Sequence, residues 1–118
     1  MLGPQTHLLA RYMDLLTARQ RLTAVNIANA DTPGYKTRDI DFEMELAQAL
    51  DGLPPGDAPP PYHHEVGGLA VKNDGNDVSL DREMRMLGES TMRFDLAAML
   101  VRGNIGAVRS AIQEGRNG

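Results

Sequence analysis

The stretch that decides the fold is residues 80–112, LDREMRMLGESTMRFDLAAMLVRGNIGAVRSAI. Alternating steps of four and three residues pick out one set of positions: Leu80, Met84, Leu87, Thr91, Phe94, Ala98, Val101, Ile105, Val108 and Ile112. Only the threonine is not apolar, and a heptad pattern kept over several repeats is typical of a coiled-coil helix. Roughly 35 helical residues would form a rod on the order of 50 Å long, which is longer than a small globular core needs.

This segment is also apolar away from the heptad positions. Leu96, Met99 and Leu100 lie outside the seam, and Gly103 and Gly106 fall on the non-seam face. A helix that is apolar on several sides is buried on several sides, and each helical glycine costs about 1 kcal/mol relative to alanine unless close packing offsets it. We therefore expect one stripe to be covered by another helix of the chain and the rest by neighbouring chains.

The N-terminal segment predicts an amphipathic helix over residues 4–30. Pro33 disfavours helical geometry at Thr32, and Pro33 followed by Gly34 suits the centre of a type II turn. Together with the C-terminal heptads, this helix predicts an assembly seam of apolar side chains: Leu8, Leu15, Leu22, Val25, Leu80, Met84, Leu87, Phe94, Ala98, Val101, Ile105, Val108 and Ile112.

Between the two terminal segments the sequence is irregular. The spacing of Phe42, Leu46, Ala49 and Leu50 after an acidic start predicts a short helix over 41–50. Residues 52–68 are rich in Pro and Gly and predict a partly disordered, extended loop, and the turn signal at 73–76 predicts a short hairpin over 69–79. The expected domains are 1–35, 36–78 and 79–118, in a mainly α fold whose long terminal helices form an antiparallel, coiled-coil-like pair.

Composition excludes several classes of function. The chain has 118 residues, a net charge of −4 and a pI near 5.2, which argues against nucleic-acid binding. It contains no Cys, so disulfides and thiolate catalysis are excluded. No stretch has the length and apolarity of a membrane span, and the start lacks the pattern of a cleavable secretory signal.

Two groups of polar residues could suggest chemistry. Adjacent His63 and His64 lie in the loop, where neighbouring side chains seldom converge on one metal ion, so we expect solvent-exposed histidines. The sequence has no apolar domain that would form a pocket around Asp39, Asp41 and Glu43 and shift the pKa of their carboxyl groups. We therefore interpret them as helix-start charges or subunit contacts. We therefore expect no catalytic residues, no cofactor, no metal and no small-molecule substrate; the chain is not expected to be an enzyme.

The most specific string is NIANADTPGY at residues 26–35, continued by DIDFE at 39–43. Asn26 and Asn29 are poor helix formers one turn apart, and we expect them to hydrogen-bond chain ends or a neighbouring subunit. This string resembles the signature of flagellar rod and hook-type axial proteins, and DGNDV at 74–78 resembles the family's entry to its C-terminal helix. The resemblance rests on these positions: Asn26, Ile27, Ala28, Asn29, Asp31, Thr32, Pro33, Gly34, Tyr35, Asp39, Asp41 and Phe42.

The resemblance implies a structural component of the proximal rod of the flagellar basal body. Proteins of this family are exported through the flagellar type III apparatus without a cleavable signal, and their terminal helices pair on assembly. The implied partners are further copies of the chain, other rod proteins, the ring-to-rod junction protein and the export apparatus, and the implied location is the periplasmic rod.

The heptads alone also permit a cytosolic coiled-coil adaptor or chaperone. Fractionation of cells would distinguish the two hypotheses, because a rod protein should remain with detergent-resistant basal bodies.

Overall fold

A computed structural model of the chain describes residues 4–51 and 60–117. The described part is mainly helical and extended, with principal dimensions of 71 × 26 × 18 Å. In chain order the elements are α1 (Pro4–Ala28), β1 (Arg38–Ile40), α2 (Phe42–Ala49), β2 (His63–Glu65) and α3 (Leu80–Asn117).

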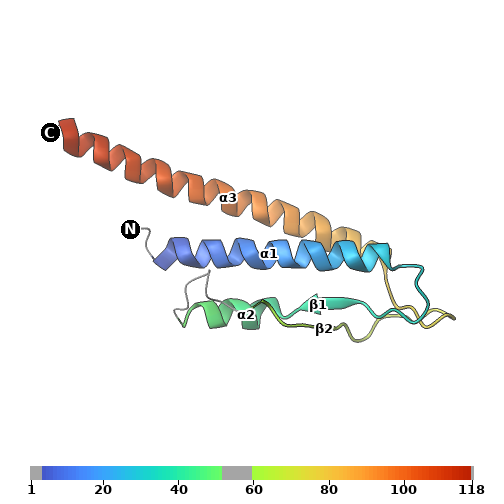
Figure 1. The fold of residues 1–118 in the computed structure, drawn as a ribbon. Helices are drawn as coiled ribbons and strands as arrows, with labels where there is room; N and C mark the ends of the chain where they lie inside the picture. Colours follow the sequence, from blue (N-terminus) through green and yellow to red (C-terminus); the bar gives the residue numbers. More distant parts are fainter. Residues whose placement is uncertain (1–3, 52–59, 118) are drawn as a thin grey trace.

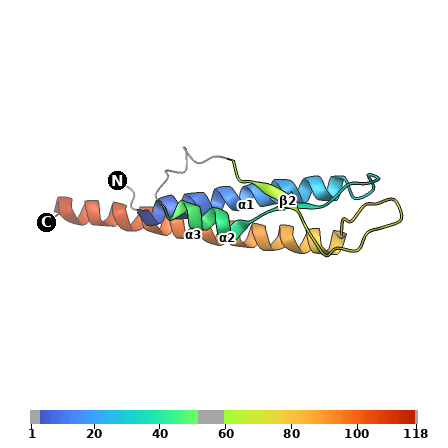
Figure 2. The same cartoon turned by 90° about the horizontal axis from the view of Figure 1, so that it is seen from below.

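The elements form three layers with α1 in the middle (Figure 1). One side of α1 packs against α3, which runs beside it in the opposite direction, and the other side packs against α2 and β1 (Figures 1 and 2). Leu15 and Leu16, at the centre of α1, are fully buried between these layers. Since α3 has 38 residues and α1 only 25, the C-terminal end of α3 extends beyond the start of α1.

Side chains and turns fix the ends of the helices. The Asp41 carboxylate accepts from the Met44 N–H at 3.1 Å and caps α2, and Ser79 Oγ accepts from the Arg82 N–H at 3.2 Å at the start of α3. After α1, the Tyr35 N–H donates to the Thr32 carbonyl at 3.2 Å across Pro33-Gly34. Gly34 has φ +74°, so this is a type II turn.

The hairpin expected over 69–79 is wrong. The turn is present, with Gly75 at φ +86°, but no strands flank it. The Lys72 N–H donates to the Asn76 carbonyl across the turn at 2.8 Å, but the pairing stops there, since the Asp77 N–H donates to the Tyr35 carbonyl in the segment after α1. The two-stranded antiparallel sheet joins β1 to β2 and pairs Asp39 with His64.

The same pairing corrects part of the loop expected over 52–68. Residues 63–65 form β2, and the following Val66 N–H donates to the Thr37 carbonyl at 2.9 Å. Regular pairing is possible here because β1 supplies an open strand edge beside it. Residues 52–59 of the expected loop lie outside the described residues.

The seam expected from the heptads differs from the face of α3 that α1 covers. Leu15 is buried, and Leu8, Leu22, Leu87, Phe94, Ala98 and Val101 are half-buried. In contrast Val25, Leu80, Met84 and Ile112 are exposed, with 51% of Leu80 and 61% of Met84 accessible. The buried positions of α3 are Glu83, Ser90 and Ala97, seven residues apart. The side chains of Ile105 and Val108 are outside the described part of the structure.

Buried polar contacts explain why the covered face of α3 differs from the expected seam. At the start of α3 the register is set by hydrogen bonds to Glu83, which is fully buried, and these rotate Leu80 and Met84 away from α1. The apolar periodicity alone therefore gives the wrong prediction for Leu80 and Met84, which it assigns to the covered face of α3.

Candidate assembly site

Asn26, the first residue of the first family-like string, joins the end of α1 to β1 and to the start of α3. Its Nδ2 donates to the Arg38 carbonyl at 2.8 Å and to Glu83 Oε2 at 3.1 Å. Its Oδ1 accepts from the Tyr35 hydroxyl at 2.7 Å and from the Arg38 N–H at 3.2 Å. The side chain is buried and fully satisfied within its own chain, and the Asn29 side chain donates to the Val25 carbonyl near the end of α1 at 2.8 Å. Of the two expected kinds of partner, groups of the same chain are therefore the ones observed.

Asn76, in the second string, hydrogen-bonds the turn that follows α1. Its Nδ2 donates at 2.8 Å to the carbonyls of both Asn29 and Thr32, and Lys72 Nζ donates to the Ala30 carbonyl at 3.2 Å. The Asn29 and Thr32 carbonyls also accept backbone N–H groups within the turn that follows α1, from Thr32 and Tyr35, so Asn76 adds a second hydrogen bond to each. The segment 72–76 therefore closes the C-terminal end of α1.

Two glycines allow the strings to approach closely. The Gly34 N–H donates to the Asp74 carbonyl at 2.9 Å, and a Cβ added to Gly75 would lie 3.4 Å from the Gly34 Cα. Both glycines have positive φ, which side chains disfavour. Next to them, Asp77 Oδ1 accepts from the Thr37 N–H at 2.6 Å and from its hydroxyl at 2.8 Å.

We call this interlocked region the turn-end hub and define it by its central side chains: Asn26, Tyr35, Thr37, Asn76, Asp77 and Glu83. In the part of the chain that the structure describes, no buried side-chain polar atom lacks a hydrogen-bond partner. A polar network that is fully satisfied in this way specifies one arrangement of the chain.

Carboxylates tie the hub to the three layers. Asp39 accepts from Arg19 of α1 at 3.1 Å and from Arg82 of α3 at 3.0 Å, and Arg82 also donates to Glu83 at 2.7 Å. Asp39 and Glu83 are both buried. One strand residue thus links the two terminal helices. Of the three carboxylates expected as helix-start charges or subunit contacts, Asp41 caps α2 and Glu43 lies in its first turn, whereas Asp39 lies in β1.

Burial raises the pKa of the Tyr35 hydroxyl above its ordinary 10.0, and the negative charge of Glu83 adds to the rise. Arg38 acts in the opposite direction, and Asp77 adds a smaller rise. The hydroxyl is therefore protonated at neutral pH and can serve as the donor to Asn26.

Phe42 of the resemblance is also a packing residue. Its ring meets the Tyr12 ring edge-on at 5.4 Å between centroids, and the Arg19 guanidinium lies 5.0 Å from its centroid. On the same side of α1, buried Glu45 accepts from Arg11 at 3.3 Å and from the Tyr62 N–H at 2.9 Å. These contacts hold α2 and the segment before β2 onto α1.

The structure offers little for chemistry. A shallow recess of about 440 Å³ lies between α2 and α3, but its cations Arg19 and Arg93 are paired with Asp39 and Glu89. His63 Nδ1 accepts from Arg38 Nε at 2.8 Å. Within residues 4–51 and 60–117, no three His, Asp or Glu side chains gather in a way that could hold a metal ion.

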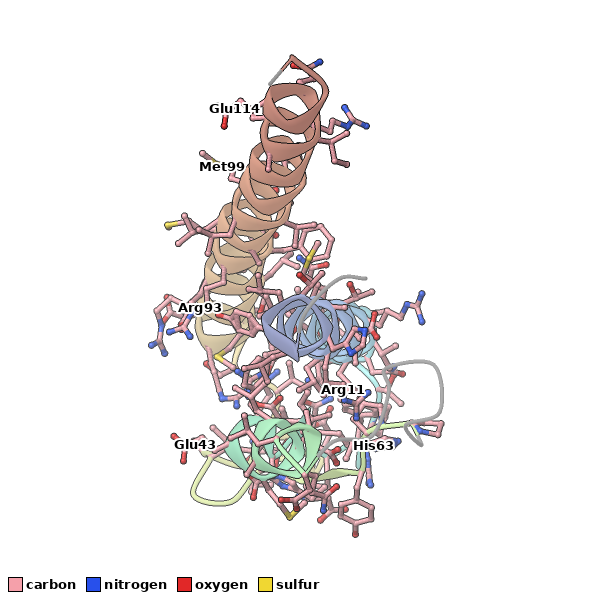
Figure 3. The ribbon with its side chains drawn as sticks, turned by 90° about the vertical axis from the view of Figure 1, so that its left-hand side faces the viewer. Arg11, Glu43, His63, Arg93, Met99 and Glu114 are labelled. Atoms are coloured by element: carbon pink, nitrogen blue, oxygen red, sulfur yellow. The ribbon has the colours of Figure 1, made fainter. Side chains whose placement is uncertain are left out.

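The most exposed apolar surface is on α3. Away from α1 its side chains are large and accessible, with 71% of Met92 exposed: Met92, Leu96, Met99 and Leu100. Positions Gly88, Gly103 and Gly106 have open space where a Cβ would be. Figure 3 shows Met99 projecting from α3 away from the other two layers. Among the helices that the structure describes, none combines the length and the apolar character of a membrane span.

The chain is similar in sequence to known proteins. Residues 13–36, which contain the end of α1 and the first string, match a family model described as flagella basal body rod protein. Flagellar basal body rod protein FlgB of Borrelia hermsii is 36% identical over 106 residues, covering 73% of this chain and 78% of the relative. The chain belongs to the FlgB family of flagellar basal body rod proteins.

Two further relatives carry the same name. FlgB of Cereibacter sphaeroides is 34% identical over 116 residues, covering 88% of this chain and 90% of the relative. FlgB of Escherichia coli strain K12 is 29% identical over 122 residues, covering 87% and 88%. Family membership makes the chain a structural component of the flagellar basal-body rod, and its location is the flagellar basal body.

The candidate residues of the sequence now have positions. The structure brings Asn26, Tyr35 and Asp39 together at one end of the molecule, and the exposed seam residues lie along α3. Sequence reasoning missed Glu83, Asn76 and Arg82, which are the partners of the first string. The sequence signal that could have indicated these partners is the second string, DGNDV. Its Asn76 and Asp77 hydrogen-bond the first string and the segment after it.

Proposed function

We propose that this chain assembles helically into the proximal part of the flagellar rod, and that its terminal helices associate as coiled coils with those of its neighbours. The carrying observation is the exposed apolar surface of α3. Such a surface on a long helix marks an interaction site, and a contact that repeats without closing produces a helical array. The role is structural rather than catalytic.

We further propose that the chain reaches the periplasm through the flagellar type III apparatus. The fitting partners are copies of itself, other rod proteins, the ring-to-rod junction protein and the export apparatus. The narrow, elongated body, 71 Å long and 18 Å in its thinnest direction, is a suitable building block for a rod.

Met92→Asp tests the role of the α3 surface. The substitution places a charge on an exposed position, so the chain should still fold, but it should be lost from isolated basal bodies and motility should fail. Val71→Asp is the matched control, because Val71 is another exposed large apolar side chain but lies in a loop. Equal incorporation of both variants would contradict the proposal.

Fractionation separates this function from that of a cytosolic adaptor or chaperone. A tagged, otherwise unchanged chain should remain with detergent-resistant basal bodies. Recovery of the chain only in the soluble cytosolic fraction of motile cells would overturn the rod assignment.

A further inference from the structure

Two stretches of the described chain each carry side-chain charges of only one sign. Residues 41–51, which cap and form α2, contain four acidic residues and no basic residue. Residues 96–113 of α3 contain two arginines and no acidic residue. In an otherwise mixed surface these are opposite and complementary in sign.

The acidic surface is exposed and carries apolar side chains. Buried Glu45 is neutralised by Arg11, which leaves the charges of Asp41, Glu43 and Asp51 exposed. Met44 is exposed beside them. We call Asp41, Glu43, Met44 and Asp51 the acidic face of α2. Because the opposite side of α2 packs on α1, this face is directed away from the centre of the molecule.

The basic surface has the same mixed character. Arg102 and Arg109 are exposed and seven residues apart, so they share one face of α3. Leu96, Met99 and Leu100 add exposed apolar area in the same segment. We call Leu96, Met99, Leu100, Arg102 and Arg109 the basic segment of α3. In the described part of the chain, the side chains of Glu43, Asp51, Arg102 and Arg109 make no hydrogen bond or ion pair.

The two surfaces cannot meet within one chain. The helices α2 and α3 pack on different sides of α1, and Figure 3 shows α2 and the C-terminal end of α3 at opposite sides of the molecule when it is viewed along its length. Each copy therefore offers an acidic face at one side and a basic segment at the other. This is the geometry of a heterologous contact, which repeats from copy to copy.

From this geometry we propose that the acidic face of α2 in one copy docks on the basic segment of α3 in a second copy. The inference rests on the proposed rod function and names the surface through which like copies meet. Methionine and leucine provide the contact area, because they adapt to one another, and the charges set orientation and exclude wrong alignments.

Cross-linking in isolated basal bodies tests the contact, since the chain has no native Cys. Two differently tagged copies are co-expressed, one with Ala47→Cys on the exposed side of α2 and one with Met99→Cys. A short bismaleimide should join the two tags. A control pair of Ala47→Cys with Ala28→Cys, an exposed position on α1, should give little product.

Charge reversal tests the specificity. Arg102→Glu with Arg109→Glu should lower the cross-link yield by roughly ten-fold, and Glu43→Lys with Asp51→Lys in the other copy should restore it. Arg21→Glu, at an exposed position on α1, should leave the yield unchanged. Incorporation of both tagged chains without a cross-link, or a yield that ignores charge reversal, overturns the contact and leaves the rod function intact.

A second measurement covers the case in which the cysteine variants fail to incorporate. Sedimentation velocity measures self-association of the purified chain at low salt. Self-association should be weaker in each charge-reversed variant than in the unchanged chain, and association should recover when the two variants are mixed. No recovery on mixing overturns the contact. Absence of the unchanged tagged chain from basal bodies would instead overturn the proposed function.

Discussion

The two ends of this molecule are stabilised in opposite ways. At the turn end, α1, β1 and the start of α3 are joined by a buried polar network centred on Asn26. At the other end, α3 extends beyond α1 with apolar and basic side chains in solvent. The first end is complete within one chain, whereas the second end has its apolar surface available for neighbours.

This contrast relates the family signature to assembly. Asn26 and Tyr35 of the first string and Asn76 and Asp77 of the second bond within the chain and position the start of α3, whereas Asp41 and Glu43 lie on the acidic face of α2 that we propose as a contact. Signature residues can thus be structural supports of an interface without touching the partner.

The largest expected effect is at the hub. Asn26→Ala removes the hydrogen bonds that Asn26 makes to Glu83, the Tyr35 hydroxyl and the Arg38 backbone N–H. It should reduce the free energy of unfolding by about 3 kcal/mol, because each buried polar group left unsatisfied costs about 1–3 kcal/mol. Urea unfolding of the purified chain measures it. Asn73→Ala, at an exposed position of the 72–76 turn, is the control. Equal stability of the two variants would show that the hub does not hold the fold.

A smaller loss is expected from Asp39→Asn. The change removes a charge that bridges Arg19 and Arg82, both mostly buried, and should cost about 2 kcal/mol. Asp81→Asn is the matched control, since Asp81 is 90% exposed and lies 3.7 Å from Arg85, a pair that contributes little. Thermal melts of both variants would decide, and an equal shift would contradict the bridging role.

Glycine substitutions compare the two ends directly. Gly75→Ala should destabilise the chain by about 1–2 kcal/mol, because Gly75 has φ +86° and lies against Gly34. Gly103→Ala should stabilise the isolated chain by about 0.5–1 kcal/mol, because it adds helix propensity in open space.

Assembly should reverse this order at the α3 position. If neighbouring chains approach Gly103 closely, Gly103→Ala should lower incorporation into basal bodies although it raises the melting temperature. A variant that is both more stable and normally incorporated would remove Gly103 from the contact.

The terminal helices could be predicted from the sequence because local signals define them, although α1 ends at Ala28 rather than at the expected Ala30. Pro33-Gly34 ends the first helical region, Asp41 caps α2, and the apolar spacing of residues 80–112 extends α3. These features depend on neighbours within a few residues, so a single sequence contains them.

The rest depends on contacts between distant residues. Asn26 meets Glu83 across 57 positions, and nothing in either residue type announces that pairing. The β1–β2 pairing could not be predicted because strands of three residues are too short to show an alternating pattern. The burial of Glu83 and Ser90 could not be predicted by a rule that assigns only apolar side chains to the interior.

The smallest expected effect concerns pH. The pKa of Tyr35 is raised in the folded chain, so the folded state holds its proton more tightly than the unfolded state does. This contribution is fully present below the ordinary pKa of 10.0 and is lost as pH rises through the folded value. Melting temperatures should therefore fall more steeply above about pH 10 in the unchanged chain than in Tyr35→Phe; parallel profiles would contradict it.

Amide hydrogen exchange of the dilute, purified chain tests the contrast most directly. Amides of the turn end, over residues 23–39 and 76–90, should be the best protected, and protection along α3 should fall steadily toward near-free exchange at its C-terminal end, which extends beyond the start of α1 (Figure 1). Uniform protection along the whole of α3 in the monomer would show that its C-terminal end is stable without neighbours, and would contradict the account.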